Sequence, residues 1–265
     1  MINELKNSNS TFIIIFKLSL GGLILGTIID YLTQYDNAFT IATSLYTSFS
    51  IIIIIAKKLR EYKRIHSIEK LLGGRKVHIH IPTRGSQLGN ETRIKPLVAM
   101  EDYSSAEHLR AILCNYGIVA DIVYIPEDGI IDLDQDSINI VICGPKNSPY
   151  IDNYFKSLSE NYNFHFQKDE EGWYFEMNGS RYYSPLEDRH NQYAFLGKTD
   201  NFLLFCGIHA IGSDGVTHFL RKTSNIDTIL KQSNKNGFYS LIKSAYSAEG
   251  KVISSQLIDI KEVTE

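Results

Sequence analysis

The segment that decides the fold class is residues 138–149, INIVICGPKNSP. Its first six residues are apolar apart from Asn139, and such a short apolar run predicts a buried strand. The Gly, Pro, Asn and Ser residues that follow predict a turn. Ser148 and Pro149 suit the N-cap and first turn of a helix. The segment therefore predicts a strand, a tight loop and a helix, in that order.

The same order recurs on either side of this segment. A strand predicted at residues 77–81 runs into PTRGS at 82–86, and one at 202–206 runs into GIHAIGSDG at 207–215. Further strands are expected at 119–124, 164–166, 173–177, 181–183, 193–196, 239–246 and 251–260, and helices at 104–116, 149–158, 215–221 and 226–232. Strands that alternate with helices predict a Rossmann-like α/β domain with a mixed sheet that is parallel at its centre. We expect it to be cytosolic and to occupy residues 75–265.

Two apolar stretches precede this domain, at residues 11–29 and 38–56. A helix of either length reaches about 28 Å, close to the hydrocarbon thickness of a bilayer. Residues 1–56 are therefore predicted to form a transmembrane hairpin, followed by a basic connector helix at 57–74. The hairpin loop carries only the acids Asp30 and Asp36, whereas residues 57–72 carry a charge of +4. This bias predicts a bacterial inner-membrane protein with both termini in the cytoplasm. A cleaved signal peptide and two buried core helices are the alternatives.

Small and polar residues recur inside the predicted spans. Gly22 and Gly26 form a GxxxG pattern, which lets a second helix approach closely. The second stretch carries hydroxyls at three- and four-residue spacing: Thr40, Thr43, Ser44, Thr47 and Ser48. Ordinary packing within the hairpin explains both patterns. The other interpretation is that the hydroxyls line a pore, which requires a homo-oligomer because two helices alone cannot enclose a path.

Composition excludes several classes of protein. The chain has 265 residues, of which 43% are hydrophobic and 22% charged, and its formal charge is −3. It is therefore neither disordered nor a protein that binds nucleic acid through a cationic surface. Three cysteines without a CxxC spacing exclude a disulfide scaffold and a cysteine-rich zinc site. His78 and His80 share one strand face, but no acidic or cysteine ligand pattern accompanies them, so they predict a surface pair.

The three small-residue loops predict where a ligand binds. Loops at the carboxyl ends of parallel strands converge on one crevice, where small residues let the backbone approach a ligand and helix N-termini attract phosphate. No loop matches a Walker or GxGxxG motif, and each loop alone fits a tight turn. Together they predict a phosphate-bearing ligand, held by Arg84, Gly144, Lys146, Asn147, Ser148, Gly207, His209, Gly212 and Ser213.

A catalytic interpretation of the third loop is weaker. Cys206 precedes it and His209 lies within it, an arrangement compatible with a nucleophile and a base. The apolar neighbours of Cys206 favour a buried strand cysteine instead. We therefore predict no catalytic residue, no metal and no cofactor.

Two resemblances extend this interpretation. Residues 141–149 (VICGPKNSP) and 205–213 (FCGIHAIGS), with a tryptophan-containing strand and a Tyr-Ser-Pro between them, resemble an uncharacterised bacterial conflict-system α/β domain over residues 138–222. The layout of two spans and a cytosolic domain is similar to two-transmembrane effectors of CBASS-like anti-phage systems. That similarity implies a nucleotide or oligonucleotide second messenger as ligand, a nucleotidyltransferase as its producer, and permeabilisation of the lipid bilayer.

We therefore expect an inner-membrane effector in antiviral defence, in which a nucleotide-sensing domain controls an oligomeric pore. Ligand binding opens such an assembly only if the ligand prefers one of its states. One alternative is a membrane-anchored enzyme that cleaves a nucleotide or NAD in the same crevice. The other is a scaffold that binds no ligand.

Overall fold

The computed structural model of the chain describes residues 21, 22, 24, 27, 28, 31, 38–73, 76–84, 87–88, 91–92, 97–185, 187–233 and 237–263. The chain divides into two compact units, Met1–Ile65 and His66–Glu265. We call the second the α/β unit. Each unit is described separately below.

Helix α2 (Ala38–Leu72) contains the second predicted membrane span. In the part of the chain that the structure describes, no helix combines the length and the apolarity needed to cross a membrane. The predicted transmembrane hairpin is therefore wrong for these residues. The predicted inner-membrane location and pore depend on that hairpin and are contradicted by the same finding. The reason lies in the composition of α2. Hydroxyls interrupt its apolar residues over 43–50, and the isoleucines at 51–55 are followed almost at once by Lys57 and Lys58. The first predicted span, residues 11–29, lies mostly outside the described residues.

The hydroxyls that the sequence predicts to line a pore lie on α2. Thr47 Oγ1 donates a hydrogen bond to the carbonyl of Thr43 over 2.7 Å, a common local bond within helices. Ser44 and Ser48 are exposed, and the side chain of Thr40 lies outside the described residues. Of the GxxxG pattern, Gly26 also lies outside them. Gly22 is close to α2, because a Cβ placed there would lie 2.7 Å from Cγ of Tyr46.

The end of α2, from His66 onward, belongs to the α/β unit. Ile68, Leu71 and Leu72 are buried, and Ser67 Oγ donates a hydrogen bond to Asp227 Oδ1 over 2.6 Å. Asp227 lies on α6 (Thr223–Gln232). Gly73, with a φ of +74°, follows the helix and ends it as predicted, because a left-handed residue suits a glycine.

The α/β unit is built on a mixed sheet of eight strands among the described residues. Their order is β13–β12–β10–β11–β6–β1–β4, with β5 paired to β1. Strands β5, β1, β6 and β11 are parallel, and β10, β12 and β13 continue the sheet in antiparallel pairing. The prediction of a mixed α/β sheet with a parallel centre is confirmed. The bounds are β1 Val77–Arg84, β4 Leu97–Val98, β5 Ala120–Ile125, β6 Ile138–Ile142, β10 Gln192–Thr199, β11 Phe202–Gly207, β12 Gly237–Tyr246 and β13 Val252–Glu262.

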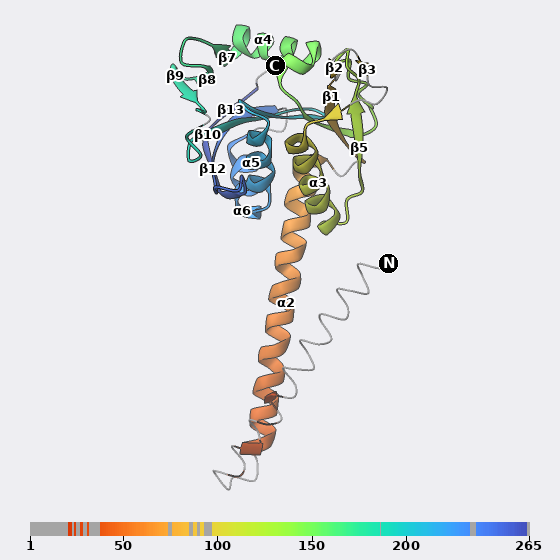
Figure 1. Cartoon of the computed structure of the whole chain (residues 1–265). Coiled ribbons are helices and arrows are strands. Elements are labelled where there is room, and N and C mark those ends of the chain that lie inside the picture. The colour runs from red at the N-terminus through yellow and green to blue at the C-terminus, as the bar shows by residue number, and fades with distance from the viewer. Residues whose placement is uncertain are drawn as a thin grey trace. The chain divides into compact units, whose positions relative to one another are not determined.

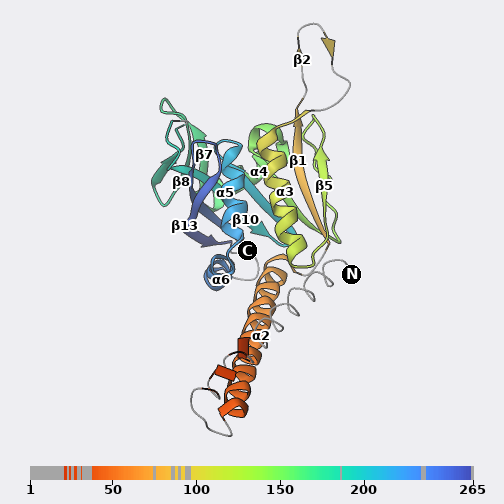
Figure 2. The same cartoon turned by 60° about the horizontal axis from the view of Figure 1, so that its bottom comes forward.

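Both faces of this sheet are covered (Figures 1 and 2). Helices α3 (Met100–Asn115), α5 (Ile211–Leu220) and α6 lie on one face, and α4 (Pro149–Tyr162) lies on the other with strands β7–β9. All five residues of β6 are therefore buried, because a parallel strand covered on both sides has no solvated face. On the α4 face the core contains Val141 and Leu204 with Phe155 and Phe195.

A three-stranded meander extends the α4 side. It consists of β7 (His165–Lys168), β8 (Trp173–Met177) and β9 (Ser180–Tyr183). Asn178 and Gly179 have φ angles of 55° and 74°, so the hairpin turn predicted there is confirmed. Phe175 of this meander joins the aromatic core, 5.7 Å from Phe164 between ring centroids. A smaller hairpin, β2 (Gln87–Leu88) with β3 (Glu91–Thr92), lies between β1 and β4 in the sequence.

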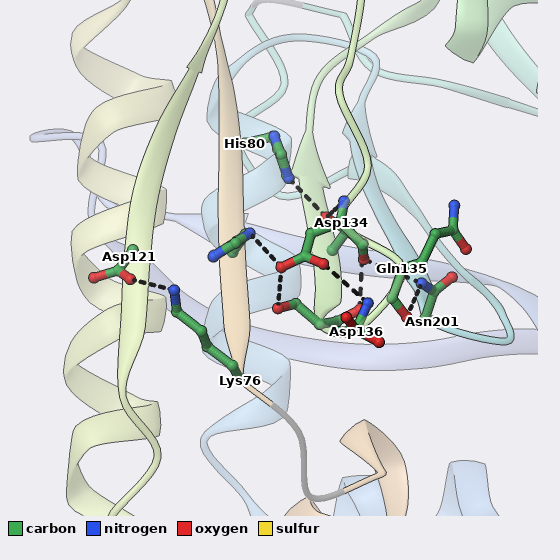
Figure 3. Close-up of polar contacts among 10 residues, drawn as sticks. Lys76, His80, Asp121, Asp134, Gln135, Asp136 and Asn201 are labelled. Carbon is green, nitrogen blue, oxygen red and sulfur yellow. Dashed lines mark hydrogen bonds and ion pairs between the residues drawn. The ribbon is translucent and has the colours of Figure 1, made fainter.

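A polar cluster occupies the amino ends of the parallel strands, and Figure 3 shows it. The Nε2 atom of His80 on β1 lies 3.0 Å from Oδ1 of Asn139 on β6. The Asn139 amide nitrogen donates to the carbonyls of Asp134 and Ser137, so Oδ1 must be the acceptor and His80 Nε2 carries the proton. His80 is only 2% exposed. The prediction that it belongs to a surface pair is therefore wrong, because the segment carrying Asp134 covers β1.

Burial lowers the pKa of His80, and the nearby charge of His78 acts in the same direction, against the opposing effects of Asn139 and Asp132. The folded state therefore favours the neutral ring. Below the ordinary pKa of 6.5, the unfolded chain takes up a proton that the folded chain does not.

We predict that the free energy of unfolding decreases as the pH falls from 6.5 towards the lowered pKa of His80. In the variant His80→Gln, the slope of that free energy against pH should shrink by up to about 1.4 kcal/mol per pH unit. Urea unfolding at several pH values measures the slope. The exposed His190 supplies the control: His190→Gln should retain the wild-type slope, and an equal change in both variants would contradict the assignment.

Candidate functional site

The helices that follow the two central strands β6 and β11 lie on opposite faces of the sheet. Helix α4 follows β6 on one face, and α5 follows β11 on the other. The carboxyl ends of two such parallel strands leave an opening between the diverging loops, which is where open α/β sheets bind ligands. A hollow of about 440 Å³ lies at this point. We call it the crevice. Its lining residues are Asp102, Cys143, Gly144, Pro145, Lys146, Asn147, Phe166, Trp173, Gly207, Ile208, His209, Ala210 and Ser213.

One side of the crevice depends on two glycines in contact. A Cβ added to Gly207 would lie 2.7 Å from Cα of Gly212 and would also collide with the carbonyl oxygen of His209. Only glycine at Gly207 therefore permits the turn that joins β11 to α5. Gly144, at the end of β6, differs. A Cβ there would meet only Cys206 Sγ, at 3.8 Å, and the φ of −96° is open to any residue. Gly144 is thus dispensable for folding.

An aromatic wall closes another side. Trp173 and Phe166 come from β8 and β7, and their ring centroids lie 5.1 Å apart. The ammonium of Lys146 lies 4.1 Å from the centroid of the Trp173 ring, a cation–π contact that fixes the lysine at the crevice. Lys146 belongs to the short 3₁₀ helix η1 (Pro145–Asn147) after β6. The site thus combines a cation with an aromatic surface.

His209 is held by a hydrogen bond to another segment of the same chain. Its Nε2 atom lies 2.7 Å from the carbonyl oxygen of Ser184, which can only accept, so Nε2 carries the proton. The amides of Gly212 and Ser213 donate to the carbonyls of His209 and Ala210. The amides of His209 and Ala210 have no backbone partner in the described part of the chain. Two amides of the first helical turn, those of Gly212 and Ser213, are therefore already used, whereas the amides of His209 and Ala210, two residues that line the crevice, are not paired with described backbone.

Asp102 and two cysteines complete the site. Asp102 lies in the first turn of α3 and is buried. Cys206 is fully buried, and burial raises the pKa of its thiol, with the charges of Cys143 and Asp102 adding to the effect. A thiol with a raised pKa is a poor nucleophile at neutral pH. The preference for a buried strand cysteine over a catalytic one therefore agrees with the structure.

The structure brings most of the predicted ligand residues together. Gly144, Lys146, Asn147, Gly207, His209 and Ser213 all line the crevice, and Gly212 supports Gly207 from behind. Arg84 ends β1, but its side chain lies outside the described residues. Ser148 is elsewhere: its hydroxyl donates to the carbonyl of Gly129 over 2.7 Å and does not cap α4, although Ser148 is the N-cap residue. The predicted N-cap position of Ser148 and first-turn position of Pro149 are confirmed.

Ser148 lines a second hollow on the other side of η1. This hollow, of about 550 Å³, is lined by Thr83, Glu127, Asp128, Pro145, Lys146, Asn147, Ser148, Pro149 and Asp152. Thr83 thus places the end of β1 here and not in the crevice. With three carboxylates against one lysine, this hollow repels an anion. The phosphate-binding expectation therefore applies to the crevice.

Three residues that line the crevice come from elements away from the predicted loops and were missed by the sequence analysis. Phe166 and Trp173 belong to the meander, and Asp102 to a helix that begins well after β1. Nothing in the local sequence pattern places these elements beside the loops after β6 and β11. The single tryptophan of the chain was the one available signal, because a lone tryptophan on a partly polar strand is compatible with a binding surface.

The comparisons with known proteins add no relative. No protein-family model matches the chain, and neither a curated protein nor a solved structure matches it.

The two glycines of the crevice give a matched test of its construction. Gly207→Ala should lower the free energy of unfolding by about 1–3 kcal/mol, because the new methyl collides with backbone. Gly144→Ala should change it by less than about 0.5 kcal/mol. Urea unfolding followed by Trp173 fluorescence measures both. Equal losses in the two variants would show that the turn at Gly207 is not built as described.

Proposed function

We propose that the α/β unit binds a nucleotide in the crevice and acts as a sensor of that ligand. The observation that carries the proposal is the combination found at the carboxyl ends of β6 and β11. Trp173 and Phe166 offer aromatic surfaces for a base. Lys146 and the amides of His209 and Ala210 offer charge and hydrogen-bond donors for a phosphate.

The charges of the crevice favour a ligand with few phosphates. Lys146 is the one lysine or arginine among the described residues that line it, and Asp102 carries the opposite charge. A triphosphate would place several negative charges against a single ammonium. A phosphodiester-linked oligonucleotide carries one negative charge per phosphate, and a nucleoside monophosphate carries about −1.5 to −2 in total near neutral pH. We propose this class of ligand.

Binding is proposed over cleavage on chemical grounds. A cleaving enzyme needs an activated nucleophile or a base beside the ligand. Burial keeps the Cys206 thiol protonated, and one nitrogen of His209 is committed to the Ser184 carbonyl. Apart from the Cys143 thiol, the polar and aromatic groups that line the crevice supply charge, hydrogen-bond donors and aromatic surface, which are the means of recognition.

Consecutive elements of the α/β unit connect the crevice to the end of α2. Ser213 in the first turn of α5 lines the crevice, and α6 follows α5 within three residues. On α6, Asp227 accepts the hydrogen bond of Ser67, at the end of α2. We propose that a ligand which displaces the loop at 207–213 acts on α2 through α5 and α6.

The biological setting is proposed on the sequence resemblance alone. The two matching segments, 141–149 and 205–213, are also the two loops that form the crevice. We propose that the chain senses its ligand in a bacterial conflict system. The further proposals, a homo-oligomer and an oligonucleotide second messenger from a nucleotidyltransferase, come from the similarity to CBASS-like anti-phage effectors, without the transmembrane hairpin that the described residues contradict. This makes short phosphodiester-linked oligonucleotides the first ligands to test.

Trp173 allows a direct titration, because it is the only tryptophan of the chain and lies at the crevice. The full chain is titrated with the four ribonucleoside 5′-monophosphates, linear and cyclic diribonucleotides, and ATP. We predict a saturable change in tryptophan fluorescence with at least one monophosphate or diribonucleotide, and weaker binding of ATP. Mass analysis of the recovered ligand should show it unaltered.

The lysine provides the matched control. Lys146→Met should weaken binding at least about tenfold, because a charge-assisted hydrogen bond contributes about 1.5–3 kcal/mol. Lys231→Met, on the exposed end of α6, should leave the affinity unchanged. If no ligand of the set changes the fluorescence, or if both lysine variants bind as the wild type does, the proposed function is wrong. A cleaved ligand would favour the enzyme alternative.

A further inference from the structure

Two cysteines lie side by side beneath the crevice. Strands β6 and β11 pair in parallel up to Ile142 and Phe205, and the amide of Cys143 donates to the carbonyl of Phe205 over 3.2 Å. Cys143 and Cys206 are thus the next pair in register. Both belong to the core on the α4 face, with Val141 and Leu204 two residues before them, so their side chains point to the same side of the sheet.

This spacing is compatible with a covalent bond. Neighbouring strands lie about 4.8 Å apart, and disulfides join Cα atoms separated by roughly 4.4 to 6.8 Å. In the described part of the chain neither cysteine takes part in a disulfide. Cys143 lines the crevice, whereas Cys206 lies behind it, 3.8 Å from the position of a Cβ on Gly144. A small reagent in the crevice therefore reaches Cys143 first, and Cys206 is the adjacent partner.

We propose that Cys143 and Cys206 form a dithiol that a hydroperoxide oxidises to a disulfide beneath the crevice. The Cys143 thiolate attacks one oxygen of hydrogen peroxide and the O–O bond breaks, which produces a sulfenic acid. The hydroxide that leaves takes up the proton released by the Cys143 thiol and becomes water. The Cys206 sulfur then attacks the Cys143 sulfur, the S–O bond breaks, and a second water carries away the thiol proton. Two thiols and one peroxide become one disulfide and two waters.

Burial affects the rate and the product differently. It raises the pKa of Cys206 and so keeps that thiol protonated, which makes closure slow near neutral pH and faster in alkali. The disulfide itself is uncharged, so the apolar surroundings do not oppose it. The bond would fix the separation of the strand ends that carry Gly144 and Gly207, and both residues line the crevice. Oxidation would therefore alter ligand binding, a consequence that rests on the proposed function.

The third cysteine gives an internal control. Cys114 is exposed and lies twelve residues along α3 from Asp102, about 18 Å at the rise of an α-helix. The full chain carrying Cys114→Ser is treated with hydrogen peroxide, unfolded and alkylated, and its mass is then measured by mass spectrometry. The expected product has lost two hydrogen atoms, takes up no alkylating reagent, and regains two alkylatable thiols after reduction. In the wild type, peptide mapping should place the bond between Cys143 and Cys206.

Other outcomes overturn the proposal. It fails if both thiols remain alkylatable under conditions that oxidise Cys114 in the wild type, or if each cysteine gains oxygen without a bond between them. Cys206→Ser should leave oxidised Cys143 with added oxygen and no bond, and Cys143→Ser should leave Cys206 reduced. If either variant fails to fold, peptide mapping of the oxidised wild type still shows whether Cys143 and Cys206 are joined.

The effect on the crevice is measured separately. Trp173 titration of the oxidised and re-reduced Cys114→Ser chain should show at least about tenfold weaker binding in the oxidised form, recovered on reduction. A disulfide that leaves the affinity unchanged overturns control of the crevice but not the dithiol. If the reduced chain binds no nucleotide, the proposed function fails while the mass result still decides the redox proposal.

Discussion

The parallel pairing of β6 with β11 is the constraint on which the rest of the α/β unit depends. These strands are neighbours in the sheet, with Asn139–Ile142 paired to Phe202–Phe205, yet the helices after them leave to opposite faces. That divergence opens the crevice and fixes which loops line it. It also places Cys143 beside Cys206 and brings the meander after α4 over one side of the opening. The turn at Gly207 and Gly212 is the local condition that lets α5 start so close to the end of β11.

Much of this arrangement is predictable from the sequence because it depends on local patterns. Apolar runs that end in Gly-rich loops identify β1, β6 and β11, and strands that alternate with helices imply a parallel centre. A parallel centre in turn predicts that the loops after β6 and β11 converge. The Asn178–Gly179 turn follows from the need for positive φ angles at both residues.

The remainder depends on contacts between distant segments, which no local pattern encodes. Trp173 and Asp102 reach the crevice only through the packing of β8 and α3. His80 is buried because the segment carrying Asp134 folds over it and Asn139 supplies an acceptor. The lack of a ligand pattern beside the two histidines therefore did not imply a surface position. The Ser148 hydroxyl donates to the carbonyl of Gly129 across a loop, although Ser148 is the N-cap residue of α4 as predicted. The predicted hairpin failed because the apolarity of α2 is interrupted by hydroxyls and ended by Lys57 and Lys58.

Amide hydrogen exchange of the full chain, with and without the ribonucleoside monophosphates and diribonucleotides, tests the central claim most directly. It reports every backbone segment at once and does not depend on Trp173 or on any variant. The account predicts slower exchange in residues 143–147 and 207–213 when a ligand is present, and no comparable slowing in the loop 127–136 beside the acidic hollow. Slowing confined to other segments, or none with any nucleotide, would contradict a nucleotide site between β6 and β11.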